Sequence, residues 1–155
     1  MIQLVLARHA KSDWGDPSLD DHDRPLNARG MRDAPEMARR ILRAGVRPGL
    51  VLTSTALRAR DTAQYFATTF DSELRELPDL YASTPAVLLD AARAAGADEV
   101  MVVAHDPGMS ALVSALAGRH VSMTTCAVAV FTWHDATWAE VGTTAPDEVS
   151  LNAPN

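Results

Sequence analysis

The chain has 155 residues, of which 47% are hydrophobic and 22% are charged. This length suits a single domain, and the apolar content is too high for an intrinsically disordered protein. The formal net charge of −6 argues against a protein that coats nucleic acid or an anionic membrane, because both need a positive excess. Thirteen of the 14 basic residues are arginines. We attribute most of these arginines to the base composition of the coding DNA. An anion-binding site would require several arginines that converge at one place.

Cysteine content and the start of the chain narrow the class further. Cys126 is the only cysteine, so no disulfide can form within the chain, and no Cys/His spacing is typical of a zinc site. The apolar run at the start ends at Arg8 and His9, which is short for a signal peptide. No stretch reaches the ~20 apolar residues of a membrane span. We therefore expect a cytoplasmic protein that binds no nucleic acid or membrane.

The first predicted strand is Ile2–Ala7, an apolar run rich in branched residues that suits a strand buried on both faces. Lys11–Pro25 is dense in Asp, Gly, Pro and Ser and predicts a long loop. Loops of this length in compact domains are usually functional. A helix is predicted next, because apolar residues between positions 34 and 42 recur at helical spacing, and it ends near Gly45.

The start of this helix is open to two interpretations. Asn27 can cap a first turn, whereas Asp33 with Glu36 three residues later forms a second capping signal. Because Pro35 lies inside the segment, we expect a kink or a restart of the helix near it.

Leu50–Thr53 predicts a second buried strand. Ser54 or Thr55 can cap the helix that follows, whose apolar residues run from Ala59 to Phe70. Glu73–Leu77 predicts a short edge strand.

Two further segments continue the alternation of strands and helices. Thr84 and Pro85 form a good N-cap and first-turn pair for a helix. Glu99–Ala104 is a third strongly apolar strand, which stops at His105 and leads through a short turn into another helix.

The C-terminal part differs from this alternation. Ala127–Trp133 and Thr137–Val141 predict two strands of an antiparallel hairpin. Residues 143–155 lack an apolar period and predict a polar tail after a single domain over residues 1–142. The order of elements predicts an α/β fold of three layers, with a mostly parallel sheet flanked by helices and an antiparallel edge from the hairpin.

Basic side chains follow three of the predicted strands. Arg8 and His9 end the first strand, Arg58 lies in the first turn of the helix after the second, and His105 ends the third. Ligands of such sheets bind at the carboxyl ends of the strands, so these side chains are expected to meet at one edge. Spacing alone does not separate Arg58 from Arg60, because both lie near the start of the same helix.

Two imidazoles and two guanidiniums at one edge would form an anion site. Guanidinium groups match phosphate oxygens in a bidentate way and keep their charge at any working pH. A neutral imidazole can attack phosphorus, and a second, protonated imidazole can donate a hydrogen bond to an equatorial oxygen. Such a set suffices for phosphoryl transfer without a metal. The alternative for each residue taken alone is an ordinary surface charge or helix cap.

Three stretches of the chain carry a family resemblance: LARHAKSDWGDPSLDDHDRPLNARG, TSTALRARDTA and VVAHDPGM. They resemble the histidine phosphatase superfamily and, within it, the small SixA-like phosphohistidine phosphatases. The resemblance runs from residue 1 to about residue 133 and implies a phosphoglycerate mutase-like fold. It also implies roles for individual residues. His9 would be the nucleophile that is transiently phosphorylated, and Arg8, Arg58 and His105 would hold the phosphoryl oxygens.

The loop arginine Arg24 looks like a further phosphate-binding residue of the SixA-like group. Its alternative is a salt bridge to a neighbouring aspartate of the same loop. Asp106 follows the second histidine, as it does in the distantly related acid phosphatases, where that aspartate donates a proton. Asp106 is therefore a possible general acid, although a cap of the helix that starts at Pro107 is the favoured interpretation.

The resemblance implies a phosphatase that needs no metal or organic cofactor and acts through a phosphohistidine intermediate, most simply on protein phosphohistidine. No counterpart of the glutamate acid of the mutases stands out, which suits phosphoramidates, because a departing imidazole needs little protonation. One alternative is a small-molecule phosphomonoesterase, and another is a phosphoryl-binding module without catalysis. The expected partner is thus a phosphorylated protein or a small phosphorylated substrate, and a monomer is favoured.

Overall fold

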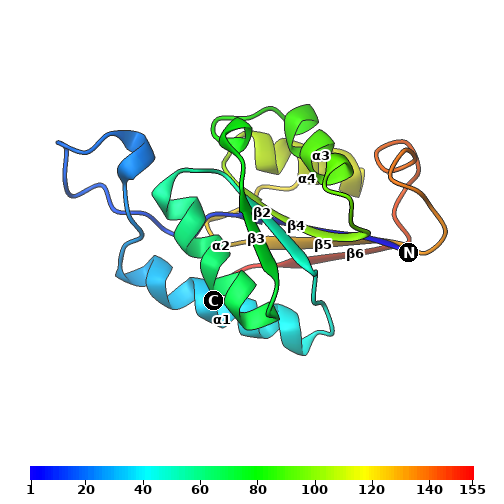
Figure 1. Cartoon of the computed structure of the whole chain (residues 1–155), viewed down its shortest axis with the longest axis horizontal. Helices are drawn as coiled ribbons and strands as arrows, with labels where there is room; N and C mark the ends of the chain where they lie inside the picture. Colours follow the sequence, from blue (N-terminus) through cyan, green and yellow to red (C-terminus); the bar gives the residue numbers. More distant parts are fainter.

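The computed structural model describes all 155 residues as one six-stranded sheet with helices on both faces (Figure 1). The strand order is β3-β2-β4-β1-β5-β6. The strands are β1 (Ile2–Arg8), β2 (Leu50–Thr53), β3 (Glu73–Glu76), β4 (Glu99–Ala104), β5 (Val128–Trp133) and β6 (Glu148–Asn152). The helices are α1 (Ala28–Arg43), α2 (Leu57–Phe70), α3 (Pro85–Ala94) and α4 (Gly108–Ala117), with short 3-10 turns at Asp21–Asp23 and Pro78–Leu80.

The register of the sheet brings three strand ends to one edge. The pairs β1–β4, β2–β4 and β2–β3 are parallel, whereas β5 pairs antiparallel with both β1 and β6. Val103 of β4 lies beside Ala7 of β1 and beside Thr53 of β2. Residues that follow β1, β2 and β4 therefore emerge side by side, and the predicted α/β fold of three layers is confirmed.

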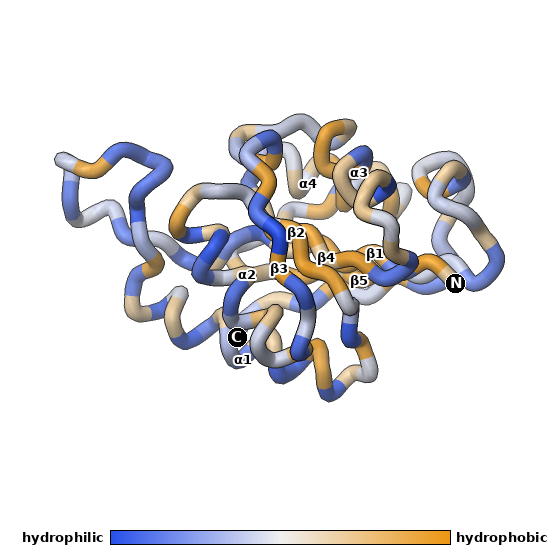
Figure 2. Tube along the Cα trace, in the orientation of Figure 1, coloured by the Kyte–Doolittle hydropathy of each residue, from blue (hydrophilic) through white to orange (hydrophobic).

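The sheet separates two hydrophobic cores. Helices α1 and α2 pack on one face, and helices α3 and α4 pack on the other. Because both faces are covered, the central strands are apolar at nearly every position, and they form the orange centre of Figure 2. No helix has the length and apolar content needed to span a membrane.

Helix α1 differs from the prediction of a restart near Pro35. It runs unbroken from Ala28, and the Asn27 side chain caps it by accepting a hydrogen bond from the Gly30 amide at 2.9 Å. Asp33 is not a second cap, because it lies within the helix and pairs with Arg29. One helix is favoured since it buries its whole apolar face, which outweighs the single hydrogen bond lost at the proline.

The C-terminal segment also differs from its prediction. The antiparallel edge exists, but its outer strand is β6 rather than Thr137–Val141, so residues 143–155 are not merely a tail. The residues around Trp138 instead form turns, and its indole donates a hydrogen bond to the Ala97 carbonyl. The side chains of β6 are largely exposed, and an edge strand of this kind needs no apolar period to form its ladder.

Candidate active site

A cavity of about 210 Å³ opens at the carboxyl edge of the sheet, where β1 and β4 end. Every residue that the sequence predicts for the site lies in its wall. The lining consists of Arg8, His9, Lys11, Ser12, Trp14, Arg24, Arg58, His105, Asp106 and Thr125.

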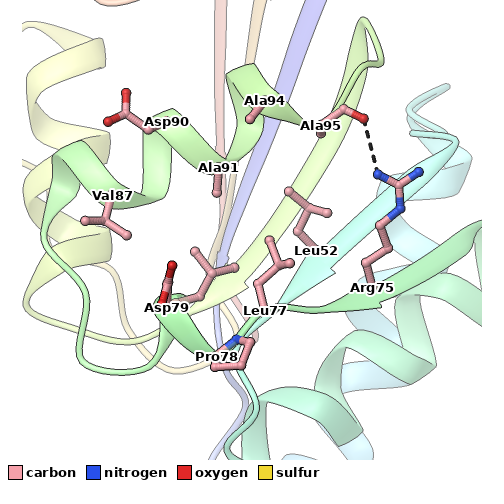
Figure 3. Close-up of a pocket in the computed structure, with 11 residues that line it drawn as sticks. Leu52, Arg75, Leu77, Pro78, Asp79, Val87, Asp90, Ala91, Ala94 and Ala95 are labelled. Carbon is pink, nitrogen blue, oxygen red and sulfur yellow. Dashed lines mark hydrogen bonds between the residues drawn. The ribbon is translucent and has the colours of Figure 1, made fainter.

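A larger groove of about 520 Å³ lies between α3 and the strands β2 and β3 (Figure 3). Apolar side chains form most of its walls, and Arg75 at one end donates a hydrogen bond to the Ala95 carbonyl. Its lining contains no histidine, serine, threonine or cysteine, whereas the smaller cavity is lined by two histidines and three arginines.

His9 follows β1 and is 7% exposed. Its Nδ1 lies 2.7 Å from the Ala10 carbonyl oxygen, so Nδ1 carries the hydrogen and donates it. Burial lowers the pKa of His9 from 6.5 to about 4, and the nearby arginines act in the same direction. The ring is therefore neutral near pH 7 and keeps a free electron pair on Nε2, as a nucleophile requires.

His105 follows β4, and its ring centroid lies 5.1 Å from that of His9. The His105 Nε2 lies 2.7 Å from Ser54 Oγ, and Ser54 Oγ already accepts a hydrogen bond from the Ala56 amide. The Ser54 hydroxyl has Nε2 as its one side-chain acceptor, so we assign the hydroxyl hydrogen to that contact and the ring hydrogen of His105 to Nδ1. That Nδ1 is buried and has no hydrogen-bond partner within the protein.

The charge of the His105 ring differs from the prediction of a second, protonated imidazole. Burial lowers the pKa of His105 to about 3, so the ring is neutral, yet its Nδ1–H can still donate. Neither Ser54 nor Thr55 has its predicted role as the N-terminal cap of helix α2. Helix α2 begins after Ala56 without a side-chain cap, and the Ser54 hydroxyl orients His105 instead.

The structure separates Arg58 from Arg60. The Arg58 side chain is 7% exposed, lines the cavity and has a buried Nε with no partner within the protein. Its two terminal nitrogens donate to Asp21, one to the backbone oxygen at 2.6 Å and one to the carboxylate at 3.0 Å. Arg60 lies outside the cavity lining, where its Nε is 3.7 Å from Glu76.

Arg8 and Asp106 form an ion pair in the cavity wall. Arg8 donates from Nη1 to the Met123 carbonyl at 3.0 Å, and its buried Nε has no partner within the protein. The Asp106 carboxylate lies 3.7 Å from Arg8 and accepts hydrogen bonds from both the amide and the hydroxyl of Ser110. Asp106 thus satisfies the first turn of α4, which begins at Gly108, while it also lines the cavity.

Arg24 makes the salt bridge of its alternative interpretation and also lines the cavity, and its role in phosphate binding stays a prediction. Its Nε pairs with the Asp21 carboxylate at 3.1 Å, as the salt-bridge alternative expects. The same side chain is buried and lines the cavity, where Nη1 donates to Ser12 Oγ at 2.8 Å. The Trp14 ring lies against the guanidinium, with 3.4 Å between the ring centroid and Cζ of Arg24.

Asp21 is the site residue that sequence reasoning treated only as one of several loop acids. Its carboxylate binds Arg24, Arg58 and the hydroxyl of Tyr81, and the Tyr81 ring packs edge-on against His105. The hydrogen bond from Tyr81, followed by those from the two arginines, holds the pKa of Asp21 well below its usual range. The density of aspartates predicted a functional loop, but no local pattern distinguished Asp21 from its neighbours.

The cavity offers several donors to one ligand. Three buried N–H groups of its lining residues have no partner within the protein: Arg8 Nε, Arg58 Nε and His105 Nδ1. Buried donors are normally paired, so their concentration around one cavity indicates an oxyanion ligand. A tetrahedral phosphoryl group has the charge and the number of oxygens to satisfy them, and His9 lines the same cavity.

Comparisons with known proteins agree with this chemistry. Residues 4–82 match the family model described as histidine phosphatase superfamily (branch 1). An uncharacterized protein of Mycobacterium tuberculosis is 40% identical over 126 residues, which cover 79% of this chain and 75% of the relative. A crystal structure from Agrobacterium tumefaciens, a proposed phosphohistidine phosphatase SixA, has a TM-score of 0.84 and 27% identity, and the match covers 99% of this chain and 98% of that one. A similar protein from Nakamurella multipartitia has a TM-score of 0.84 and 25% identity, with coverage of 99% and 96%. These matches confirm the resemblance drawn from the sequence.

Proposed function

This chain belongs to the histidine phosphatase superfamily and is a phosphatase of its SixA-like branch, and we propose that it hydrolyses phosphohistidine on a protein through a phosphorylated His9. The observation that carries the proposal is the placement of a neutral His9 beside three buried, unpartnered donors. This arrangement supplies both a nucleophile and a preformed site for the charge of the transferred group. The two solved relatives described above carry the same proposed activity in their names.

In the first step, the electron pair of His9 Nε2 attacks phosphorus opposite the substrate imidazole. A new P–N bond forms to His9 while the P–N bond of the substrate breaks, and the electron pair of the broken bond stays on the departing ring. That ring leaves as neutral imidazole because its other nitrogen already carries a proton. Arg8, Arg58 and His105 donate to the equatorial oxygens, and these bonds strengthen as negative charge develops. Arg24 lies in the same wall and adds a positive charge.

In the second step, water attacks the phosphorylated His9. The P–N bond to His9 breaks, its electron pair returns to Nε2, and orthophosphate leaves with the oxygen of the water. The same donors hold the oxygens in both steps, so one cavity serves the whole cycle. The proposal includes no metal, because arginines provide the positive charge that a cation would otherwise bring and repel a cation at the same place.

The contacts of Asp106 support phosphohistidine as the substrate. Both of its oxygens accept hydrogen bonds from Ser110, and one lies 3.7 Å from Arg8, so the carboxylate is already engaged by groups of the protein. A departing imidazole needs little protonation, whereas an alkoxide needs a strong acid. A phosphomonoesterase is the second candidate, since Asp106 lines the cavity and could protonate an alkoxide there.

The test compares the two substrate classes directly. Hydrolysis of a histidine-phosphorylated peptide and of a panel of sugar phosphates and nucleotides would be measured with the wild type and with Asp106→Asn. We expect a much higher kcat/KM for the phosphohistidine peptide and little loss in Asp106→Asn. Preferred turnover of a phosphomonoester, with a large loss in Asp106→Asn, would instead establish the second candidate.

A further inference from the structure

Trp14 is the only hydrophobic residue among the ten that line the cavity. It lies in the loop after β1, and 73% of it is exposed. The rest of the lining is charged or polar, so it can bind the phosphoryl group but offers little carbon surface to whatever is attached to it. A leaving group in this cavity therefore has one apolar neighbour, Trp14.

The structure holds the Trp14 ring in place despite its exposure. The Arg24 guanidinium covers part of the ring at 3.4 Å from its centroid, and Arg24 is itself fixed by Ser12 and Asp21. Cation–π contacts of this kind favour one ring orientation. The loop backbone is anchored nearby, because Asp13 donates its amide to the Pro25 carbonyl at 2.8 Å. Trp14 is thus an ordered aromatic surface that is mostly open to solvent.

We infer that Trp14 is a stacking platform for a planar group bonded to the phosphoryl group, and that it selects imidazole or aryl leaving groups over alkyl ones. This inference deepens the proposed function, on which it rests, by naming the chemical class of the leaving group. A flat ring can lie against the indole and bury apolar area on both partners. A serine or glycerol chain has no such face and gains little from the contact.

Binding of two inhibitors that need no turnover tests this inference. Phenylphosphonate and methylphosphonate would be titrated calorimetrically into the wild type, Trp14→Phe, Trp14→Leu and the control Leu19→Ala. Leu19 is an exposed apolar residue of the same loop that does not line the cavity. We expect the wild type to prefer phenylphosphonate about tenfold, given typical strengths of aromatic stacking. Trp14→Phe and Leu19→Ala should keep most of this preference, and Trp14→Leu should lose it.

Three outcomes would overturn the inference. Equal weakening of both inhibitors in Trp14→Leu would mean that Trp14 only supports Arg24, and unchanged affinities would mean that it touches no ligand. A wild type without any preference for phenylphosphonate would also contradict it. Failure of the proposed function would give another result. The phosphohistidine peptide would then not be cleaved, while the wild type would still prefer phenylphosphonate to methylphosphonate.

Discussion

At the scale of single residues, the site depends on which nitrogen of each histidine carries hydrogen. The Ala10 carbonyl fixes this for His9, and the Ser54 hydroxyl fixes it for His105. Both rings are buried and neutral, so each tautomer decides whether a ring attacks or donates. The sequence predicts the two histidines, but Ser54 is found only through the fold, because it is 51 residues from its partner.

We predict that Ser54→Ala lowers kcat/KM about tenfold, a loss typical of one buried hydrogen bond. Without the hydroxyl, Nε2 of His105 can take the hydrogen, and Nδ1 then no longer donates to the phosphoryl group. Steady-state kinetics and the affinity for orthophosphate measure the effect. Ser72→Ala provides the control, since Ser72 bonds a carbonyl far from the cavity. Wild-type kinetics in Ser54→Ala would contradict the assigned tautomer.

At the scale of elements, the loop after β1 is held against the body of the molecule by charge and by close packing. Asp21 bridges this loop to α2 through Arg58, and the Lys11 carbonyl accepts from the Asn27 amide before α1 begins. The loop projects at the left of Figure 1, in blue. Its sequence predicts a loop with a function, whereas its fixed course depends on contacts with α1, α2 and Tyr81 that no local pattern contains.

We predict that Asp21→Asn weakens substrate binding about tenfold, because Arg24 and Arg58 both lose the carboxylate that orients them. The effect should appear mainly in KM. Asp20→Asn is the matched control, because it removes the same charge from the adjacent position, where the side chain makes no capping hydrogen bond. Equal effects of both variants would show that net charge rather than orientation of the arginines is responsible.

Gly30 in the first turn of α1 offers a second test of this packing. A Cβ at Gly30 would lie 2.2 Å from the Lys11 carbonyl oxygen, so Gly30→Ala must displace the loop backbone or the helix. We predict a loss of about 1–3 kcal/mol in the free energy of unfolding, as overpacking usually costs. Gly49→Ala is the control, because a Cβ there meets no atom within 4 Å. Urea denaturation compares them, and equal stabilities would contradict the tight contact.

At the scale of the whole molecule, an acidic chain contains one compact basic site. The net charge of −6 argues against broad binding of polyanions, and three arginines nevertheless line one cavity. The apolar runs of β1, β2 and β4 predict the central sheet and the edge where the site forms, because buried parallel strands leave a strong signal. The edge strand β6 leaves no such signal in the sequence, since its side chains are largely exposed and it pairs with β5 mainly through backbone groups.

The buried histidines also predict how the stability of the whole molecule depends on pH. The pKa of His9 is lowered to about 4, so between about pH 6.5 and pH 4 the unfolded chain binds a proton that the folded protein does not. Stability is therefore lost as the pH falls through this window. We predict that His9→Asn reduces the loss of unfolding free energy between about pH 7 and pH 5 by about 2 kcal/mol. Identical pH dependence in both proteins would contradict the lowered pKa.

The central claim is that His9 carries the phosphoryl group during turnover, and rapid quenching followed by mass spectrometry tests it most directly. Mixing the protein with a phosphohistidine peptide should yield a phosphoenzyme that is labile in acid and stable in alkali, with the modification on His9. His9→Ala should show neither the modification nor turnover. Full turnover by His9→Ala, or a phosphoryl group trapped on a residue other than His9, would contradict the claim.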